Sequence, residues 1–263
     1  MASLRRTVRF SINPGGETGG VNGSAGIPAM HGLGRYYEID LTCRGEPDPL
    51  TGYLVDIREI DRIVRTMLVP IIAKACEQTP TVHPATLMPR LVEAVRIAHL
   101  EGAESLRWRL SPYHAVEMPV QGSEEWAEIR VRFDFAAAHR LHVRAMSDEE
   151  NRRVFGHCNN PNGHGHNYQI EPCVRVRVAA SPMPVARIEE LVKAAILDRF
   201  DHTNLNCDTA EFAPDSGVNP SVENMARVFF GLLKPRITEA DPNASLVSMT
   251  VWETERTSAT YPG

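Results

Sequence analysis

The strongest chemical pattern in the sequence is a pair of histidines at a spacing of two. His164 and His166 are followed by Tyr168 and Ile170 at the same period. In a β-strand this period places both imidazoles on one face. A His-x-His pair with a third imidazole from a neighbouring strand supplies three nitrogen ligands and leaves a fourth position open, as in a catalytic zinc site. The spacing therefore predicts a metal site, although an isolated histidine is more often a hydrogen-bonded polar residue.

Histidines are concentrated in the second half of the chain, which favours the metal interpretation. Six of the ten lie there: His139, His142, His157, His164, His166 and His202. Cys158 lies six residues before His164, and the chain contains no CxxC pair, so a thiolate ligand is the lesser interpretation. A thiol beside a cation would have a lowered pKa and could act as base or nucleophile. The other cysteines are interpreted as inert small apolar residues: Cys43, Cys76, Cys173 and Cys207.

Two acidic residues complete the candidate chemistry. Asp201 directly precedes His202, and an adjacent carboxylate can make an imidazole a proton carrier near neutral pH. A capping or solvated pair at a helix end is the alternative. Glu253 interrupts an apolar strand face, where a carboxylate needs a partner such as a guanidine-like ligand edge or an internal arginine.

Periodicity indicates the elements that must position these residues. Alternation predicts strands over 129–137, ending before His139, over 164–170 and over 246–253. Apolar spacing of three and four predicts a helix over 184–200. A second helix is predicted from Asn219 as N-cap and Pro220 at the first position to about Pro235.

The first half of the chain shows a similar order of elements. Residues 36–44 predict a strand, and GEPDPLTG followed by YLVDI predicts a hairpin. Helices are predicted over 57–76 and 86–100, and a last strand over 106–118. Residues 13–34 contain eight of the 18 glycines and are interpreted as a flexible loop. Since GSEEW, residues 122–126, separates the two stretches, we interpret them as a diverged tandem repeat.

Composition excludes several classes of protein. With 43% hydrophobic and 23% charged residues, the chain of 263 residues is too apolar for disorder, and it has no run near the roughly 18 apolar residues of a membrane span. A net charge of −5 disfavours nucleic acid as a partner. The N-terminus MASLRRTVRF lacks the apolar core of a signal peptide and the cysteines number five, so a cytoplasmic location with reduced thiols is expected.

Five motifs together resemble the 6-pyruvoyl-tetrahydropterin synthase family, which includes the 6-carboxytetrahydropterin synthases of the queuosine pathway. The motifs are FAAAHRL, the segment 147–168 ending in CNNPNGHGHNY, DHTNLN, NPSVEN and WETE, and they span about residues 129–263. The resemblance implies the following roles: zinc ligands His139, His164 and His166; catalytic residues Cys158, Asp201 and His202; and pterin-binding residues Glu253 and Glu223. One departure is His157, where the family usually has a lysine before the cysteine.

The same resemblance implies an α+β fold of tandem tunnelling-fold (T-fold) modules. Each module is an antiparallel sheet with helices on one face, and the barrel is closed by oligomerisation. We expect a catalytic module at 126–263 and a degenerate, structural module at 1–121, in which Leu33 and Arg35 replace the histidine pair and no zinc binds. A homo-oligomer, most simply a trimer of tandem chains, would follow.

The activity implied by the resemblance is that of a lyase. It is a zinc-dependent reaction on 7,8-dihydroneopterin triphosphate that releases triphosphate and yields 6-pyruvoyl-tetrahydropterin. Two alternatives remain open: a 6-carboxytetrahydropterin synthase of queuosine biosynthesis, and a catalytically silent zinc protein that binds pterin. Cys158 with Asp201 and His202 favours an enzyme, because binding alone does not require them.

Overall fold

The computed structural model describes residues 1–16, 26–215 and 217–263. It contains two compact units. Unit one comprises Met1–Ile129 with Val176–Pro182, and unit two comprises Arg130–Arg175 with Met183–Gly263. Part of the predicted glycine-rich loop, residues 17–25, lies outside the described residues. The roles of the modules 1–121 and 126–263 stay predictions.

Unit one is built on an antiparallel sheet in the order β1-β2-β3-β4. Its strands are β1 (Ala2–Ile12), β2 (Arg35–Gly45), β3 (Ala103–Ser111) and β4 (His114–Pro119). Strand β5 (Trp126–Val131) begins in this unit. The buried face of β2 carries Ile39, Leu41 and Cys43, the alternation that the sequence predicted.

The hairpin predicted after residue 45 is wrong. Tyr53–Val55 forms no strand, and β2 pairs instead with β1, which the sequence analysis missed. Asp48 closes the turn by accepting hydrogen bonds from the backbone N–H groups of Leu50 and Thr51. Asp56 then caps the next helix by accepting from Arg58 N. The chain therefore enters a helix too soon after the turn for a strand to form.

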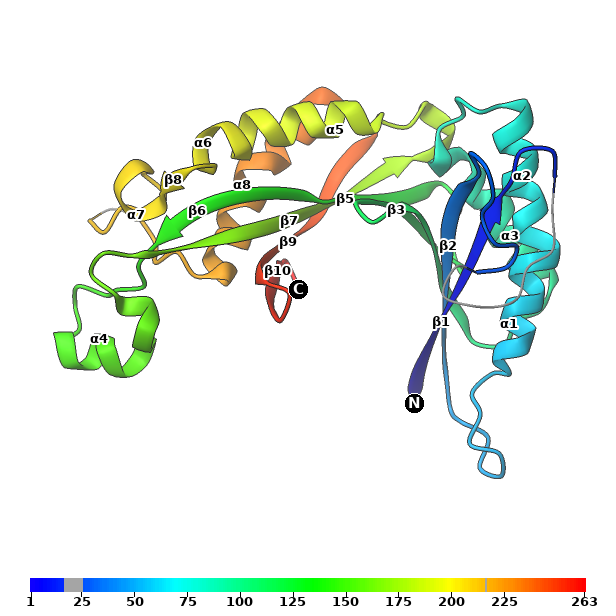
Figure 1. Cartoon of the computed structure of the whole chain (residues 1–263), viewed down its shortest axis with the longest axis horizontal. Coiled ribbons are helices and arrows are strands. Elements are labelled where there is room, and N and C mark those ends of the chain that lie inside the picture. The colour runs from blue at the N-terminus through cyan, green and yellow to red at the C-terminus, as the bar shows by residue number, and fades with distance from the viewer. Residues whose placement is uncertain (17–25, 216) are drawn as a thin grey trace. The chain divides into compact units, whose positions relative to one another are not determined.

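The single strand predicted over 106–118 is wrong as well. The segment forms two strands, β3 and β4, joined by a turn at Pro112 and Tyr113. The helices of unit one occur where they were predicted. They are α1 (Ile57–Ile63), the π-helical turn η1 (Val64–Leu68), α2 (Val69–Gln78), the 3-10 turn η2 (Pro84–Leu87) and α3 (Met88–Ile97). The helices lie beside the sheet (Figure 1), and their buried residues include Ile60, Ile72 and Leu91.

Unit two has a sheet in which β7 pairs with β6 on one side and β9 on the other. Its strands are β6 (Phe133–His139), β7 (His164–Arg177), β8 (Thr203–Asn204), β9 (Ala244–Thr254) and β10 (Thr257–Tyr261). The two residues of β8 pair in parallel with β6. The predicted strand ending before His139 is confirmed, with a break at Arg132, and β10 was not predicted.

Unit two begins its helices with α4 (Asp148–Phe155) and the 3-10 turn η3 (Gly156–Asn159). The 3-10 turn η4 (Val178–Ala180) belongs to unit one. The predicted helix 184–200 is confirmed as α5 (Val185–Val192), the π-helical turn η5 (Lys193–Leu197) and α6 (Asp198–Phe200). Two further helices follow, α7 (Leu205–Asp208) and α8 (Val222–Ala240). Each unit has a π-helical turn within its helices, η1 after α1 and η5 after α5.

Helix α8 differs from its prediction at both ends. Its N-cap is Ser221, whose side chain accepts from Asn224 N, rather than Asn219. It continues through Pro235 to Ala240. A proline inside a helix removes one hydrogen bond and crowds the carbonyl of the residue four positions earlier, which here is Gly231.

The core of unit two is an aromatic cluster between the sheet and α6 and α8. Phe135 of β6 stacks on Tyr168 of β7 at 5.0 Å between ring centroids and contacts Phe229 of α8 at 5.8 Å. Phe229 in turn contacts Phe200 at 4.9 Å. The expected α+β fold with largely antiparallel sheets and helices on one face is confirmed (Figure 1). In the described part of the chain, no helix has the length and apolar character needed to cross a bilayer.

Candidate metal centre and active site

Three imidazoles converge at one end of the aromatic face of unit two. In the antiparallel β6–β7 pair, His139 lies opposite His164, and Ala137 lies opposite His166. Directly opposed residues share a face of the sheet, and the small side chain of Ala137 leaves room for His166. The ring centroids of His139 are 4.5 Å from His164 and 5.3 Å from His166, and those of the latter two are 4.8 Å apart. The predicted common face of the histidine pair is confirmed.

The His139 ring is fixed in the orientation that a metal ligand requires. The residue is fully buried, with 0% of its surface exposed. Its Nδ1–H donates to the carbonyl oxygen of Pro220 at 2.8 Å, just before α8. Such a bond leaves the lone pair of Nε2 for a metal. Burial lowers the pKa of His139, and also that of His166, so both rings favour the neutral, ligating form.

A carboxylate also lies beside these imidazoles. Oε1 of Glu253, near the end of β9, lies 3.4 Å from Nε2 of both His139 and His166. The ligand atoms of His139, His164, His166 and Glu253 all lie within 4.8 Å of one another. Glu253 lies beside the histidine pair because β9 pairs with β7; the predicted open fourth position of the metal stays a prediction.

The donor set fits Zn²⁺. Imidazole nitrogens and carboxylate oxygens are typical zinc ligands. Nε2 of His139 and Nε2 of His164 are 3.1 Å apart, close to the roughly 3.3 Å between ligand atoms in a tetrahedron with bonds of about 2.0–2.1 Å. Nε2 of His166 and Nδ1 of His164 are buried without a hydrogen-bond partner among the described residues. A cation among the rings would satisfy Nε2 of His166.

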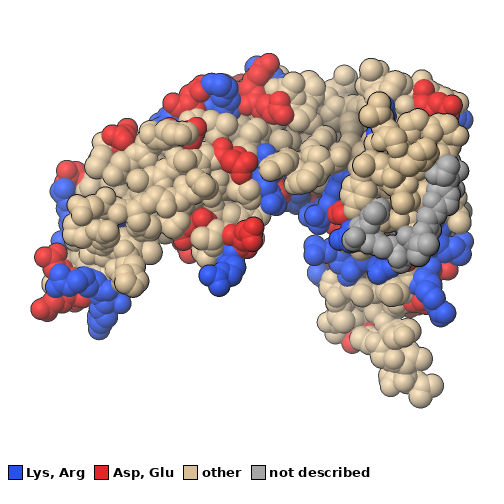
Figure 2. All heavy atoms as spheres, viewed as in Figure 1, with Lys and Arg blue, Asp and Glu red and all other residues tan. Residues whose placement is uncertain are grey.

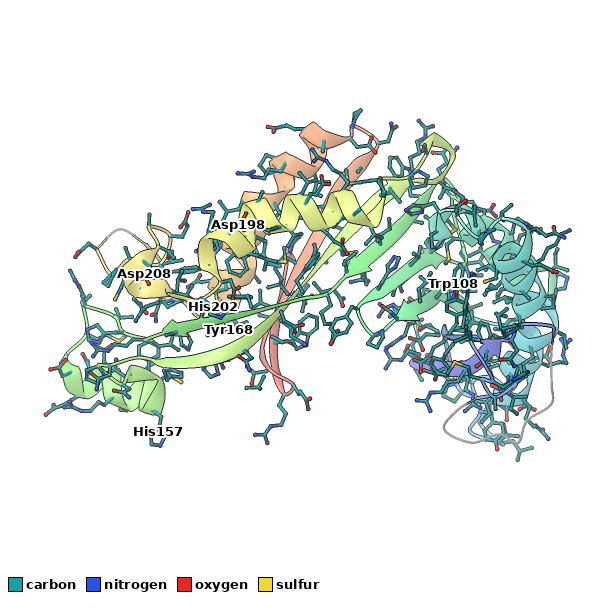
Figure 3. The ribbon with its side chains drawn as sticks, turned by 45° about the horizontal axis from the view of Figure 1, so that its top comes forward. Trp108, His157, Tyr168, Asp198, His202 and Asp208 are labelled. Carbon is teal, nitrogen blue, oxygen red and sulfur yellow. The ribbon has the colours of Figure 1, made fainter. Side chains whose placement is uncertain are left out.

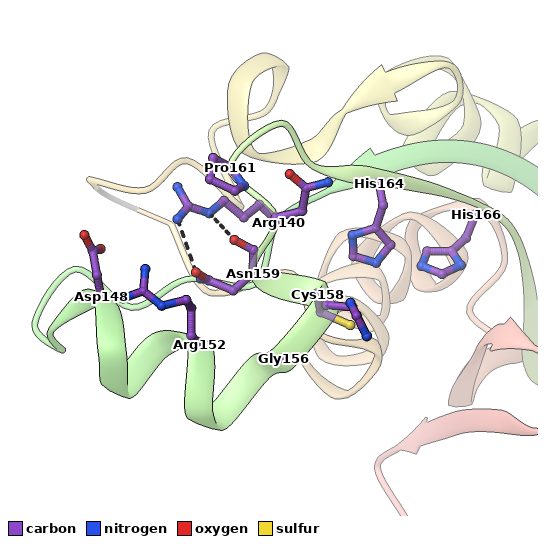
Figure 4. A pocket seen from close by; sticks show the side chains of 11 residues that line it. Arg140, Asp148, Arg152, Gly156, Cys158, Asn159, Pro161, His164 and His166 are labelled. Atoms are coloured by element: carbon purple, nitrogen blue, oxygen red, sulfur yellow. Dashed lines mark hydrogen bonds between the residues drawn. The ribbon is translucent and has the colours of Figure 1, made fainter.

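Cys158 lies in a cavity that also includes two of the imidazoles. The cavity has a volume of about 680 Å³, and its wall includes Cys158, His164 and His166 (Figure 4). Burial and the nearby carboxylate of Glu253 raise the pKa of the Cys158 thiol. The expected lowering of this pKa therefore requires a positive charge that offsets Glu253.

Asp201 and His202 form a hydrogen-bonded pair, and His202 lines a hollow other than the cavity of Cys158. Oδ1 of Asp201 lies 2.9 Å from Nδ1 of His202 and accepts from Ala136 N at 2.9 Å. The bond from Ala136, and then His202, lower the pKa of Asp201. His202 has a φ of 59° and a side chain that is 81% exposed. The hollow lined by His202, which is labelled in Figure 3, shares His166 with the cavity of Cys158, but Cys158 does not line it.

The remaining predicted residue is farther from the chemistry. Glu223 lies exposed in the first turn of α8 and does not line the Cys158 cavity. His157, which replaces the usual lysine, is exposed and lines that cavity; its side chain points outward beyond α4 (Figure 3).

The sequence analysis missed the asparagines that hold the loop after His139. Nδ2 of Asn159 donates to Leu141 O at 2.7 Å, Asn206 accepts from Arg140 N at 2.7 Å, and Asn219 accepts from His142 N at 3.1 Å. Asn151 holds the next turn by accepting from Val143 N at 2.7 Å. The asparagines of CNNPNG, DHTNLN and NPSVEN were the available signal, because asparagine side chains commonly satisfy backbone groups in loops.

Glycine is required where β7 begins. Gly163 has a φ of 71°, a conformation that L side chains rarely adopt. A Cβ there would lie 3.1 Å from the carbonyl oxygen of His139. The turn that places His164 opposite His139 therefore depends on this residue.

Comparisons with known proteins agree with this geometry. The family model for 6-pyruvoyl tetrahydropterin synthase matches residues 128–263, slightly more than half of the chain. The chain is 35% identical over 140 residues to human 6-pyruvoyl tetrahydrobiopterin synthase, covering 52% of this chain and 92% of that protein. It is 38% identical over 131 residues to a Caenorhabditis elegans protein named a putative 6-pyruvoyl tetrahydrobiopterin synthase, covering 49% of this chain and 89% of the relative.

Among solved structures, the C. elegans 6-pyruvoyl tetrahydropterin synthase is 33% identical, with a TM-score of 0.46, covering 52% of this chain and 96% of that one. The family match falls on the half of the chain that carries the imidazoles, Cys158 and the Asp201–His202 pair. The chain belongs to the 6-pyruvoyl tetrahydropterin synthase family through residues 128–263.

Proposed function

We propose that the protein is a zinc-dependent lyase that converts 7,8-dihydroneopterin triphosphate to 6-pyruvoyl-tetrahydropterin with loss of triphosphate. The observation that carries this proposal is the convergence of three imidazoles from β6 and β7 beside the thiol of Cys158. Family membership supports the reaction class.

The metal would be held by His139, His164 and His166. Bound there, Zn²⁺ would polarise oxygens of the substrate side chain and supply the positive charge that favours the thiolate of Cys158. Cys158 would then move a proton at the side-chain carbons. Glu253 would hold the pterin ring through two parallel hydrogen bonds, leaving the imidazoles as it does so, and Glu223 would lie near the ring.

The Asp201–His202 pair would carry a second proton. Asp201 fixes Nδ1 of His202, which leaves Nε2 to exchange protons, and 81% exposure makes the ring accessible. Because His202 and Cys158 line different hollows, we propose that active sites form between copies of the chain in a homo-oligomer, most simply a trimer. Light scattering that gives the mass of a monomer at micromolar concentration would contradict the assembly.

The direct test is turnover. Zinc-loaded protein is incubated with 7,8-dihydroneopterin triphosphate, and the pterin products are identified by mass. We expect the pyruvoyl product and equimolar triphosphate, and we expect Cys158→Ser to lose turnover while keeping its zinc. Cys207→Ser is the matched control, since Cys207 is exposed and does not line the Cys158 cavity. Absence of the pyruvoyl product from the parent protein would refute the proposal.

A further inference from the structure

The cavity beside Cys158 has a basic wall that the proposed chemistry does not use. Arg140 and Arg152 both line it, together with Cys158 and the histidine pair (Figure 4). One arginine follows the metal ligand His139 in sequence, and the other comes from α4. The two guanidinium groups therefore reach one cavity from separate elements.

The side chain of Arg140 is held in place, but by neutral groups. Its Nε donates to the carbonyl oxygen of Asn159 at 3.2 Å, and its Nη2 donates to Oδ1 of Asn159 at 3.4 Å. Asn206 brackets its backbone by accepting from the N–H and donating to the carbonyl oxygen. In the described parts of the chain no carboxylate pairs with this guanidinium, so its charge is positioned but not neutralised.

Arg152 is exposed and makes no ion pair with any described residue. Other arginines of unit two do have carboxylate partners: Arg132 with Glu171, Arg144 with Asp215, Arg187 with Glu190 and Arg199 with Glu211. Asp148 lies one helical turn before Arg152 and lines the same cavity, but the two form no ion pair. Acidic and basic side chains gather at the surface where Figure 1 places α4 (Figure 2).

We infer that Arg140 and Arg152 form a polyphosphate subsite beside Cys158, which takes the triphosphate chain of the substrate. The inference rests on the proposed function for the identity of that substrate. Guanidinium groups match phosphate oxygens with paired N–H donors. A volume of about 680 Å³ lies within the range of roughly 300–1,000 Å³ for small-molecule pockets. A ligand that spans both arginines places its phosphates on one side of Cys158 and its ring on the side of the imidazoles.

Asp148 gives the subsite a second electrostatic feature. Its carboxylate repels a polyanion on the same wall, so it limits how tightly the released triphosphate stays bound. Removal of this charge should strengthen polyphosphate binding, while removal of the Arg152 charge should weaken it. Opposite effects from two residues one turn apart would separate local electrostatics from a change in the fold of α4.

The test measures binding of inorganic tripolyphosphate by calorimetry to the zinc-loaded protein at fixed ionic strength. We expect Arg152→Gln to weaken binding about five- to tenfold, as loss of one charge-assisted contact at an exposed site should, and Asp148→Asn to strengthen it. The matched control is Arg153→Gln, which removes the same charge from the next residue of α4, outside the cavity. Any direct contact of the probe with zinc is the same in the variants and cancels in the comparison.

Equal affinities of Arg152→Gln and Arg153→Gln would overturn the subsite. With the pterin triphosphate as substrate, Arg152→Gln should raise KM and leave kcat within about twofold, since the contact is made before and during reaction. A parent protein that binds tripolyphosphate through Arg152 but produces no pyruvoyl pterin would contradict the proposed function and leave the subsite standing. If the parent and Arg152→Gln had equal turnover and bound tripolyphosphate equally, the result would contradict the subsite and leave the proposed function standing.

Discussion

Removal of single imidazoles should separate metal binding from folding. His166 is 21% exposed, and its Nε2 has no hydrogen-bond partner among the described residues. We expect His166→Ala to cost the metal-free protein about 0–1 kcal/mol. His139 is fully buried and bonded to Pro220 O. Loss of that bond costs about 1–3 kcal/mol and loss of the buried ring adds on the order of 1 kcal/mol, so His139→Ala should cost about 2–4 kcal/mol.

Both variants should lose the stabilisation that zinc provides. A ligand at about a thousand times its dissociation constant stabilises the folded state by about 4 kcal/mol, or on the order of 10 °C in melting temperature for a unit of this size. Removal of one imidazole from three should abolish most of this shift. In EDTA the two variants should therefore differ in melting temperature. Added zinc should raise the melting temperature of neither.

The assay is thermal unfolding in EDTA and in zinc, with zinc content measured by elemental analysis. His157→Ala is the control, because His157 is an exposed histidine that lines the same cavity but lies outside the group of converging ligand atoms. A His166→Ala variant that kept both its zinc and the zinc-dependent shift would refute the assignment of ligands. Equal melting of His139→Ala and the parent in EDTA would refute the role given to the bond with Pro220.

Three further substitutions test the surroundings of the site. Glu253→Gln should keep bound zinc and raise KM more than tenfold if the glutamate anchors the pterin; loss of zinc on elemental analysis would make it a ligand instead. Tyr168→Phe should leave stability unchanged or raise it by about 1 kcal/mol in urea unfolding, because the buried hydroxyl has no partner among the described residues; a clear loss would reveal a partner. In unit one, burial, and then the charge of His83, lower the pKa of His114 from 6.5 to about 4. Between pH 4 and pH 6.5 the unfolded chain binds more protons than the folded one. Burial of neutral His114 therefore gives a contribution of about 3 kcal/mol to the free energy of unfolding, which is present above pH 6.5 and lost as the pH falls toward 4. Stability of His114→Phe measured across this range should fall less than that of the parent, and parallel curves would contradict the pKa.

Much of the fold followed from local patterns. The strand before His139, the strand that begins at His164 and the helix over 184–200 each repeat at a period that matches one backbone geometry. Strand β1 was missed, although it pairs with β2 over its whole length. Its arginines at 5, 6 and 9 obscure the alternation of Leu4, Val8 and Phe10 in the sequence. Pro235 was wrongly taken as the end of α8, which continues to Ala240.

For the site, the sequence by itself determined which donors are present and that two of them share a strand face, since side-chain direction in a strand depends only on the parity of the position. The third imidazole joins them because β6 and β7 pair with His139 opposite His164. Only the tertiary structure decided that Glu253 stands among the imidazoles, that His202 lines a separate hollow from Cys158, and that Arg140 and Arg152 face the same cavity. These contacts join residues distant in sequence, and their positions are set by sheet register and by the docking of loops and helices, which no local period encodes.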